Sequence, residues 1–517
     1  MAEQSAPMFR PEISHPRTVS ELSSEFGLVP SANSVHADST PIAGVTVVSS
    51  RTQPGDVFVA LPGAKTHGAN YAVDAIERGA VAVVTDAAGV DVLGSCPVPV
   101  FISTSPRGQL GSLSSWVYRS NENDLVIVGM TGTNGKTSTS FYMEELLSLL
   151  GVTSALSSTA EIHLNGEIYQ PRLTTPESCE VHAFLAACGT TGSKAAIVEV
   201  SAQAMTHHRV DSVMFDVVGF TNLSHDHLDE YGTLDAYFAA KQQLFTAEHA
   251  RRGVISLETE WGAQLALSAT IPCVTVSRDA STESDWTVTI VNENAGGTTF
   301  ELQSRSGEVY STHIDVIGQH MASNAALAMV MISEAGWSMQ EIATRLDAVG
   351  GFHVNPPGRI ERIAGATGPN IFVDSGHTPD AISVTLSSVR RVTTGRLICL
   401  VGAGGNRDSL KRAPLGEISA TLCDEVIVTD DNSRFEDPAE IRAEVLRGAH
   451  SAGTSAAIHE IGENRDAIEF AVSHATDGDS IVWLGLGNET YREVMGEKRP
   501  HSARDLARDA LKHAGWL

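Results

Sequence analysis

A glycine-rich segment carries the strongest chemical signal in the sequence: Gly-Met-Thr-Gly-Thr-Asn-Gly-Lys-Thr at residues 129–137. It follows an apolar run at residues 125–129 and opens a helix-like stretch that starts at Lys136 and is stopped by Gly151. In that context glycines let backbone N–H groups approach phosphate oxygens, and the helix amino terminus favours an anion. Lys136 is placed to reach the outer phosphates and Thr137 to bind Mg²⁺. The segment therefore predicts a nucleotide phosphate site, although Met130 stands where the common phosphate-loop spacing has glycine.

A second group of polar residues follows four apolar runs near the end of the chain. Each apolar run is followed directly by a polar segment: 371–373 by Asp374, 397–401 by residues 402–407, 425–429 by residues 430–434, and 480–484 by residues 485–489. Helix-like stretches such as residues 438–447 separate these runs, a pattern that predicts a mostly parallel sheet. Ligands of open α/β sheets bind outside the carboxyl ends of the strands. We therefore expect the four polar segments to form one crevice.

The elements that must position these groups point to an α/β fold with three domains. Strands are expected at residues 45–48, 56–61, 80–85, 195–200 and 214–220, a helix at residues 233–250, and a hairpin from residues 286–291 and 298–302. We predict a small α/β domain over residues 1–112, with its first 35 or so residues unassigned. A central phosphate-loop domain with a parallel sheet is expected over residues 113–355, and a doubly wound, Rossmann-like domain over residues 356–517.

Composition limits the classes of function. The chain has 517 residues, 62 acidic and 35 basic, for a net charge of −27. Such a charge argues against nucleic-acid binding and against anionic membrane surfaces, which both need basic faces. No apolar run reaches the roughly 18 residues of a membrane span, and residues 1–17 lack the apolar core of a signal peptide. The six cysteines are far apart, which predicts neither a disulfide framework nor a zinc site and favours the cytoplasm.

Several further motifs extend the signal over most of the chain. They are Leu-Thr-Thr-Pro at 173–176, Glu-Val-Ser at 199–201, His208-Arg209, Phe-Thr-Asn-Leu at 220–223, Asp-His-Leu-Asp at 226–229, Ala-Ala-Lys at 239–241, Pro-Gly-Arg-Ile-Glu at 357–361, His-Thr-Pro-Asp at 377–380 and Asp-Asn-Ser-Arg at 431–434. The phosphate loop resembles that of Mur ligases and folylpolyglutamate synthases, and the whole set resembles the MurE type of Mur ligase. Residues 50–60 resemble the uridine-binding domain of that type. The family uses ATP to add a diamino acid to UDP-N-acetylmuramoyl-L-alanyl-D-glutamate in peptidoglycan synthesis.

The resemblance implies roles for individual residues. ATP would contact Gly132, Thr133, Asn134, Gly135, Lys136, Thr137, Ser138, Asn324, Arg359 and Asp374, with Asn324 at the adenine and Asp374 near the ribose and phosphates. Catalysis would depend on Lys136, Glu199, His227, Lys241 and Arg359, with Mg²⁺ held by Thr137, Glu199 and His227. Lys241 matches the lysine that carries a carbamate (N6-carboxylysine) in this family, which turns a cation into an anion.

The resemblance also implies two substrate sites and the partners that occupy them. The UDP-muramoyl dipeptide would contact Ser50, Thr174, Thr175, Ser201, His207 and Arg209, with Arg209 suited to a carboxylate. The diamino acid would contact Arg407, Asp431, Asn432, Arg434, Gly485 and Glu489, which all lie in the polar segments singled out above. Beyond these small molecules we expect no nucleic acid, no membrane insertion and a monomer.

The identity of the diamino acid depends on Arg434. A guanidinium can pair bidentately with the distal carboxylate of meso-diaminopimelate, a group that lysine lacks. The sequence therefore favours diaminopimelate, but Ser433 replaces the proline of the family signature for that substrate. Further departures are Met321 for an asparagine, Ser375 and Gly376 for Tyr-Ala, and Leu486 and Asn488 for lysine and histidine. They leave open L-lysine or L-ornithine as the amino acid, and also a nucleotide-binding paralogue without ligase activity. A folylpolyglutamate synthase is disfavoured by the uridine-type segment and by Asp-Asn-x-Arg.

Overall fold

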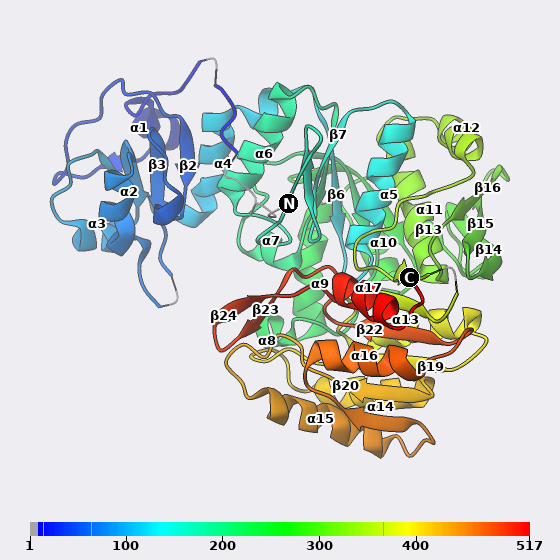
Figure 1. Ribbon diagram of the computed structural model, residues 1–517. Coiled ribbons are helices and arrows are strands. Elements are labelled where there is room, and N and C mark those ends of the chain that lie inside the picture. Colours follow the sequence, from blue (N-terminus) through cyan, green and yellow to red (C-terminus); the bar gives the residue numbers. More distant parts are fainter. Residues whose placement is uncertain (1–8, 14, 64, 366) are drawn as a thin grey trace.

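The structure is a computed structural model that describes residues 9–13, 15–63, 65–365 and 367–517, and three sheets follow one another along the chain (Figure 1). The first sheet has five strands in the order β1-β5-β4-β3-β2. Its elements are α1 (Glu21–Phe26), β1 (Val29–Pro30), β2 (Gly44–Thr46), η1 (Ser49–Arg51), β3 (Asp56–Ala60), η2 (Gly68–Tyr71), α2 (Ala72–Glu77), β4 (Ala82–Thr85), α3 (Ala87–Leu93), β5 (Val100–Ile102), α4 (Pro106–Tyr118) and η3 (Ser120–Glu122). The predicted domain boundary after residue 112 lies inside α4, whose apolar face belongs to the core of this sheet.

The second sheet holds the phosphate loop and has eleven strands, in the order β16-β15-β14-β13-β12-β11-β6-β10-β7-β8-β9. Its strands are β6 (Val126–Thr131), β7 (Ser154–Ser157), β8 (Ile162–Leu164), β9 (Glu167–Tyr169), β10 (Ala195–Glu199), β11 (Phe215–Phe220), β12 (Ala250–Ser256), β13 (Cys273–Ser277), β14 (Trp286–Asn294), β15 (Gly297–Ser304) and β16 (Val309–Ile314). The stretch from β7 to β14 is parallel, as predicted, whereas both edges continue as antiparallel strands. The sheet is therefore mixed, and the predicted hairpin forms one of its edges.

Helices cover this sheet on both faces. They are α5 (Lys136–Leu149), α6 (Ser178–Thr190), α7 (Ala202–Thr206), α8 (Leu228–Tyr231), α9 (Leu234–Gln242), η4 (Gln243–Phe245), α10 (Glu260–Ser268), α11 (Gln319–Glu334) and α12 (Met339–Val349). The predicted helix over residues 233–250 is too long: the helical part ends at Phe245, and Ala250 already begins β12. Thr246 is extended, and the short apolar run after it pairs between β11 and β13. Such a run is ambiguous between helix and strand until its neighbours are known.

The third sheet is doubly wound, as predicted. Its order is β17-β18-β22-β19-β20-β21, and all strands but the edge strand β17 run parallel. Its elements are β17 (Glu361–Ile363), β18 (Asn370–Asp374), α13 (Pro379–Val392), β19 (Leu397–Val401), α14 (Arg412–Leu422), β20 (Glu425–Val428), α15 (Pro438–Ser451), β21 (Ala457–Glu460), α16 (Asn464–His474), β22 (Ser480–Leu484) and α17 (Ala503–His513). Helices α13, α14 and α15 pack on one face, and α16 and α17 on the other. A separate hairpin of β23 (Tyr491–Val494) and β24 (Glu497–Pro500) precedes α17.

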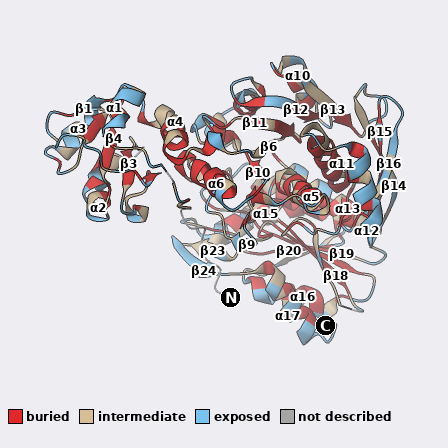
Figure 2. Cartoon of the chain, turned by 90° about the horizontal axis from the view of Figure 1, so that it is seen from above, coloured by how far each residue is buried: buried red, intermediate tan, exposed pale blue. Residues whose placement is uncertain are grey.

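Burial follows these layers (Figure 2). The sheets and the helices α5 and α11 are largely buried, while the β14–β16 edge is mostly exposed in this view. Val128, Leu156 and Ile197 of adjacent parallel strands are fully buried, as both faces of such a sheet are covered. None of the helices in the described parts of the chain is long and apolar enough to cross a membrane.

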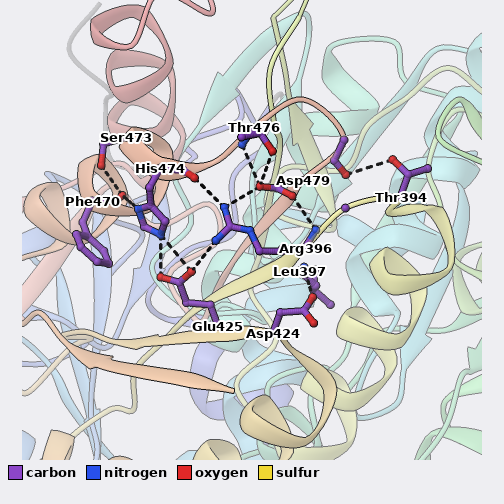
Figure 3. A network of polar contacts seen from close by, with 12 residues as sticks. Thr394, Arg396, Leu397, Asp424, Glu425, Phe470, Ser473, His474, Thr476 and Asp479 are labelled. Carbon is purple, nitrogen blue, oxygen red and sulfur yellow. Dashed lines mark hydrogen bonds and ion pairs between the residues drawn. The ribbon is translucent and has the colours of Figure 1, made fainter. Parts of the chain in front are cut away.

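A closed ionic network occupies the amino ends of the strands in the third sheet (Figure 3). The Arg396 guanidinium donates to Asp479 Oδ2 at 2.9 Å and to the His474 carbonyl at 2.7 Å, and it lies 3.5 Å from Glu425 Oε2. His474 Nε2 lies 2.9 Å from the other Glu425 oxygen, and the Leu397 N–H donates to Asp424 at 2.7 Å. These charges satisfy one another and leave the opposite, carboxyl ends of the strands for a ligand.

Candidate active site

A cavity of about 550 Å³ lies between the second and third sheets. The phosphate loop lines one side with Thr133 through Ser138, and the segment from Asp374 to Thr385 lines the other. Asn324, Arg359 and Asp374 all line it, together with His227 and Thr174. The structure thus brings together every residue that the sequence places at ATP except Gly132, which belongs to the loop without lining the cavity. A volume of this size is typical of sites for small molecules.

The backbone of the phosphate loop is fixed by Asn222, a residue to which the sequence analysis assigns no role. Asn222 Oδ1 accepts from the Asn134 N–H at 3.0 Å, while Asn222 Nδ2 donates to the Asn134 carbonyl at 3.1 Å. Thr221 Oγ1 donates to the same carbonyl at 2.6 Å. Gly135 adopts φ 89° just before α5, and a side chain there would lie 2.6 Å from Asn324 Oδ1. The loop geometry therefore needs glycine at 135 and places Asn324 directly behind it.

Two lysines share one backbone carbonyl at the base of the loop. Lys241 Nζ donates to the Gly132 carbonyl at 2.8 Å, and Lys136 Nζ donates to it at 3.1 Å. Burial lowers the pKa of Lys241 well below its ordinary value, and the charge of Lys136 lowers it further. Burial also lowers the pKa of Lys136, against the attraction of Glu199. Burial and the charge of Lys136 thus both favour the neutral amine at Lys241, against the attraction of Asp226.

Glu199 supplies an unsatisfied oxygen beside the loop. It is the last residue of β10 and is fully buried. Its Oε2 accepts from Thr159 Oγ1 at 2.7 Å, whereas its Oε1 has no hydrogen-bond partner. A buried carboxylate oxygen without a partner fits a hard cation, and the Thr137 hydroxyl on the loop is an oxygen donor of the kind that such a cation takes. Mg²⁺ takes few protein ligands and completes its shell with phosphates and water.

Arg359 reaches across the cavity to the phosphate loop. Its Nη2 donates to Thr137 Oγ1 at 3.2 Å, although the two residues belong to different sheets. The next residue, Ile360, adopts φ 49°, a strained conformation for a β-branched side chain. The Ile360 N–H donates to Asp374 Oδ2 at 2.9 Å, and Asp374 Oδ1 accepts from the Gly376 N–H at 2.8 Å. Asp374 thus fixes the backbone that aims Arg359 while lining the cavity itself.

His227 also adopts a left-handed backbone, with φ 54°, at the start of α8. Its Nδ1 lies 3.0 Å from Gln203 Nε2, and its ring packs against Tyr237 with centroids 5.8 Å apart. Burial lowers the pKa of His227, and Lys136 and Lys241 add to that shift against the opposing effect of Asp226. These effects favour the neutral form of the ring, which lines the cavity.

The residues assigned to the muramoyl dipeptide form a chain of contacts leading to Glu199. Thr159 Oγ1 donates to Thr174 Oγ1 at 3.2 Å, and Thr175 Oγ1 donates to the Glu199 carbonyl at 2.8 Å. The Ser201 N–H donates to Thr175 Oγ1 at 3.0 Å. Arg209 Nη1 donates to the Thr175 carbonyl at 3.4 Å, and its Nε lies 3.4 Å from Glu177. His207 and Ser50 are exposed and lie outside the cavity lining.

The far end of the cavity was missed by the sequence reasoning. Ser256 and Glu258 follow β12, and Arg278 follows β13. His320 lines the same end with a buried Nδ1 that has no partner, and burial lowers its pKa to about 4. The rule that ligands bind at carboxyl ends of strands would have found the first three, had residues 250–256 and 273–277 been assigned as strands; the sequence analysis assigned neither.

The four polar segments of the third sheet do meet, as predicted. Asn432 Nδ2 donates to Glu489 Oε2 at 2.6 Å, and a side chain at Gly485 would lie 2.6 Å from Asp431 Oδ2. Arg434 Nη1 donates to the Gly405 carbonyl at 2.7 Å. Burial and the neighbouring Asp431 raise the pKa of Glu489 to about 7. We call this group the amino-acid crevice: Asp431, Asn432, Arg434, Gly485 and Glu489. Arg407, the sixth predicted member, is exposed.

Two departures from the family pattern touch each other. Ser375 Oγ donates to Asn488 Oδ1 at 3.3 Å, and a side chain at Gly487 would overlap Ser375 Oγ. The Ser375 N–H donates to the Gly358 carbonyl at 2.8 Å, next to Arg359. Small residues at 375 and 487 therefore let the loop after β22 pack against the segment that carries Arg359.

Family models match three stretches of the chain. The model described as "Mur ligase family, catalytic domain" matches residues 41–108, "Mur ligase middle domain" matches residues 130–332, and "Mur ligase, glutamate ligase domain" matches residues 358–487. These stretches contain the residues that line the cavity and most strands of the three sheets. The chain belongs to the Mur ligase family.

Within that family the chain is similar to UDP-N-acetylmuramyl-tripeptide synthetase of Leifsonia xyli, with 44% identity over 98% of each chain. It is also 36% identical to UDP-N-acetylmuramoyl-L-alanyl-D-glutamate–2,6-diaminopimelate ligase of Streptomyces coelicolor, over 92% of this chain and 93% of that protein. A solved diaminopimelate ligase of the same description is 26% identical with a TM-score of 0.65, covering 97% of this chain and all of that one. A MurF ligase of Thermotoga maritima in complex with ADP shares the fold, with 15% identity and a TM-score of 0.62 over 91% of this chain and 96% of that one.

Proposed function

We propose that this protein is an ATP-dependent ligase that adds a diamino acid to UDP-N-acetylmuramoyl-L-alanyl-D-glutamate, in peptidoglycan synthesis. The observation that carries the proposal is the contact of Arg359 with Thr137 across the cavity, because it joins the phosphate loop to the part of the chain that bears the amino-acid crevice. The names of the Leifsonia and Streptomyces relatives support the same reaction.

The chemistry follows from the groups around the cavity. The glutamate carboxylate of the dipeptide takes the terminal phosphoryl group of ATP, which leaves ADP and an acyl phosphate. An amine of the diamino acid then attacks the acyl carbon, the phosphate leaves, and the amine loses a proton. Charge gathers on phosphoryl oxygens, so Lys136 and Arg359 act by electrostatic stabilisation and Arg209 by orienting a carboxylate. Mg²⁺, held by Glu199 and Thr137 and supported by His227, would neutralise the same oxygens.

Lys241 is proposed to carry a carbamate. A neutral amine reacts with CO₂ to give a carbamate and a proton, and the lowered pKa of Lys241 favours the neutral form. The product replaces a second cation beside Lys136 by an anion. This relieves the repulsion between two amines that share the Gly132 carbonyl.

The diamino acid is proposed to bind in the amino-acid crevice, with Arg407 at its edge. Its distal ammonium would face Asp431 and Glu489, a carboxylate pair in which burial and the charge of Asp431 raise the pKa of Glu489. The name of the Streptomyces relative supports diaminopimelate, and L-lysine or L-ornithine is the alternative. Since ATP and nucleotide sugars are the substrates, we expect the reaction in the cytoplasm, catalysed by a monomer.

One experiment tests the reaction. The purified protein is incubated with ATP, Mg²⁺, UDP-muramoyl-Ala-Glu and one of meso-diaminopimelate, L-lysine or L-ornithine, and products are identified by mass. We expect a UDP-muramoyl tripeptide and one ADP per product, and no product when ATP or the dipeptide is omitted. Binding of ATP without a tripeptide from any amino acid would instead support a non-catalytic nucleotide-binding protein.

A further inference from the structure

The hairpin β23–β24 lies directly against the Asp-Asn-Ser-Arg segment of the amino-acid crevice. The Arg434 N–H donates to the Glu493 carbonyl at 2.9 Å, and the Glu493 N–H donates to Asn432 Oδ1 at 2.7 Å. Arg434 also forms an isolated parallel bridge with Val494. Both backbone groups of Glu493 are therefore tied to crevice residues, which fixes where its side chain begins.

The Glu493 side chain extends toward the Arg434 guanidinium. Its Oε2 lies 3.7 Å from Arg434 Nε, while Arg434 Nη1 donates to the Gly405 carbonyl. Arg434 itself adopts φ 52°, so its direction is set by a constrained backbone rather than by a free loop. Two edges of the guanidinium thus already have partners within the chain.

Carboxylates surround this guanidinium. Arg434 faces Glu493 directly, and its charge also acts on Glu489, which in turn lies close to Asp431. Asp431 also interacts with the ammonium of Lys411, so the Arg434 guanidinium is shared between Glu493 and Glu489. An incoming ammonium group would meet favourable charge here, whereas an incoming carboxylate would have to displace Glu493 and sit close to two further carboxylates.

We propose that Glu493 is a specificity-determining residue that competes with a distal carboxylate of the substrate for Arg434. The crevice thereby accepts a diamino acid with a single carboxylate, such as L-lysine or L-ornithine, at least as well as the dicarboxylic meso-diaminopimelate. This inference rests on the proposed function, and it names the class of amino acid that the same site prefers.

The test compares two amino acids that differ by the group in question, because meso-diaminopimelate is L-lysine with a carboxylate on its ε carbon. Values of kcat/KM for both are measured with the wild type and with Glu493→Gln. We expect the wild type to use L-lysine with a kcat/KM equal to or above that for meso-diaminopimelate. Glu493→Gln should shift the ratio at least tenfold toward meso-diaminopimelate, through KM for the amino acid and without change in KM for ATP.

Glu497→Gln is the matched control on the same hairpin. Glu497 pairs with Val494 across the hairpin, is largely exposed, and lies 3.6 Å from Arg499 rather than near Arg434. Glu497→Gln removes the same charge as Glu493→Gln, but away from Arg434. Its ratio of kcat/KM for the two amino acids should therefore stay within about twofold of the wild type. Glu493→Asp keeps the charge, and we expect it to restore most of the wild-type ratio; this separates charge competition from a purely structural role.

Three outcomes overturn the inference. The first is a wild type that prefers meso-diaminopimelate by more than tenfold, and the second is an equal shift in Glu493→Gln and Glu497→Gln. The third is a shift in Glu493→Gln that persists when Arg434 is replaced by alanine, because the effect must pass through that guanidinium. A wild type that makes no tripeptide from any amino acid overturns the proposed function itself.

Discussion

The ATP cavity and the amino-acid crevice lie at carboxyl ends of two neighbouring sheets, yet they are built in opposite ways. The cavity takes its phosphate-facing wall from a contiguous segment, Thr133 through Ser138, whose shape is set by backbone and by Asn222. The crevice takes single side chains from the loops after β20 and β22, touches the Gly405 carbonyl after β19, and is bordered by a hairpin further along the chain.

Because of this difference, the two sites respond differently to substitutions of single side chains. Backbone amides and a helix amino terminus favour phosphate with little dependence on the surrounding side chains, so we expect the cavity to tolerate Met130 and Met321. A crevice made of side-chain charges changes its preference with one substitution. The ATP cavity should therefore control whether the reaction takes place, and the crevice should control which amino acid is used.

A substitution in the ATP cavity should have the largest effect on activity. Lys136→Met removes the ammonium that faces the transferred phosphoryl group, and we expect kcat to fall roughly 10³-fold for every amino acid alike. Tripeptide formation measured by mass with each amino acid checks this. Lys194→Met, at an exposed lysine, should retain full activity. A Lys136→Met loss that differed strongly among amino acids would contradict the separation of the two sites.

Removing the second amine should give the next largest effect. Lys241→Met abolishes the proposed carbamate, and we expect kcat to fall roughly 10²-fold. The thermal midpoint should not drop, because a buried amine with a lowered pKa is replaced by an apolar chain of similar length. In ¹³C-bicarbonate, the wild type should show a carbamate carbon resonance that the variant lacks. The same resonance in both proteins would assign the carbamate elsewhere, and Lys512→Met serves as the exposed control.

Breaking the crevice should leave ATP binding intact. Arg434→Ala removes the guanidinium that a distal carboxylate needs, and we expect affinity for meso-diaminopimelate to fall about tenfold or more. The dissociation constant for ATP, measured by calorimetry, should stay within twofold of the wild type. Equal losses for both ligands would mean that Arg434 supports the fold rather than the selection.

The smallest effect concerns a titratable clamp on α5, the helix that follows the phosphate loop. His163 Nδ1 lies 2.8 Å from a Glu144 oxygen and its Nε2 lies 2.8 Å from Glu161. Burial opposes protonation, but these two carboxylates outweigh it and raise the pKa of His163 to about 9. A raised pKa contributes stability that is complete below the unfolded value near 6.5 and disappears as pH rises through about 9.

His163→Gln should therefore lower the free energy of unfolding by about 1–3 kcal/mol at pH 6 and by much less at pH 10. Urea unfolding at the two pH values measures this. His450→Gln, at an exposed position on α15, should change neither value. A His163→Gln deficit that is equal at both pH values would show that the clamp acts by packing alone. A deficit at pH 6 alone would instead sharpen the contrast between the two sites. The clamp holds α5, the helix that follows the phosphate loop, whereas the crevice residues within the described parts of the chain have no such ion pair with α5.

Sequence reasoning found the parts of the site that depend on local patterns. The phosphate loop, the strands ending at Glu199 and Asp374 and the convergence of the polar segments all follow from periodicity and strand direction. It failed where the pairing of distant segments decides the outcome. Residues 250–256 form a strand between β11 and β13, whereas the sequence analysis ended its helix at residue 250 and assigned no strand after it, so Ser256 and Glu258 went unnoticed.

Roles that depend on side-chain partners were equally beyond a sequence. Asp374 uses both carboxylate oxygens to hold its own neighbourhood, and Arg434 has partners in the chain before any substrate arrives. The family resemblance assigns both positions to ligand sites without these contacts. The roles of all the site residues, and the domain boundaries, stay predictions.

The hairpin β23–β24 has an evolutionary consequence. Its two strands pair with each other in a sheet of their own, and it follows the last residue that the family model matches. The side chains of this ten-residue hairpin can therefore change without altering the strand pairing of the third sheet, while its backbone contacts to Asn432 and Arg434 keep it in place. Inheritance of a new cell-wall amino acid would then need one exchanged loop rather than a rebuilt enzyme.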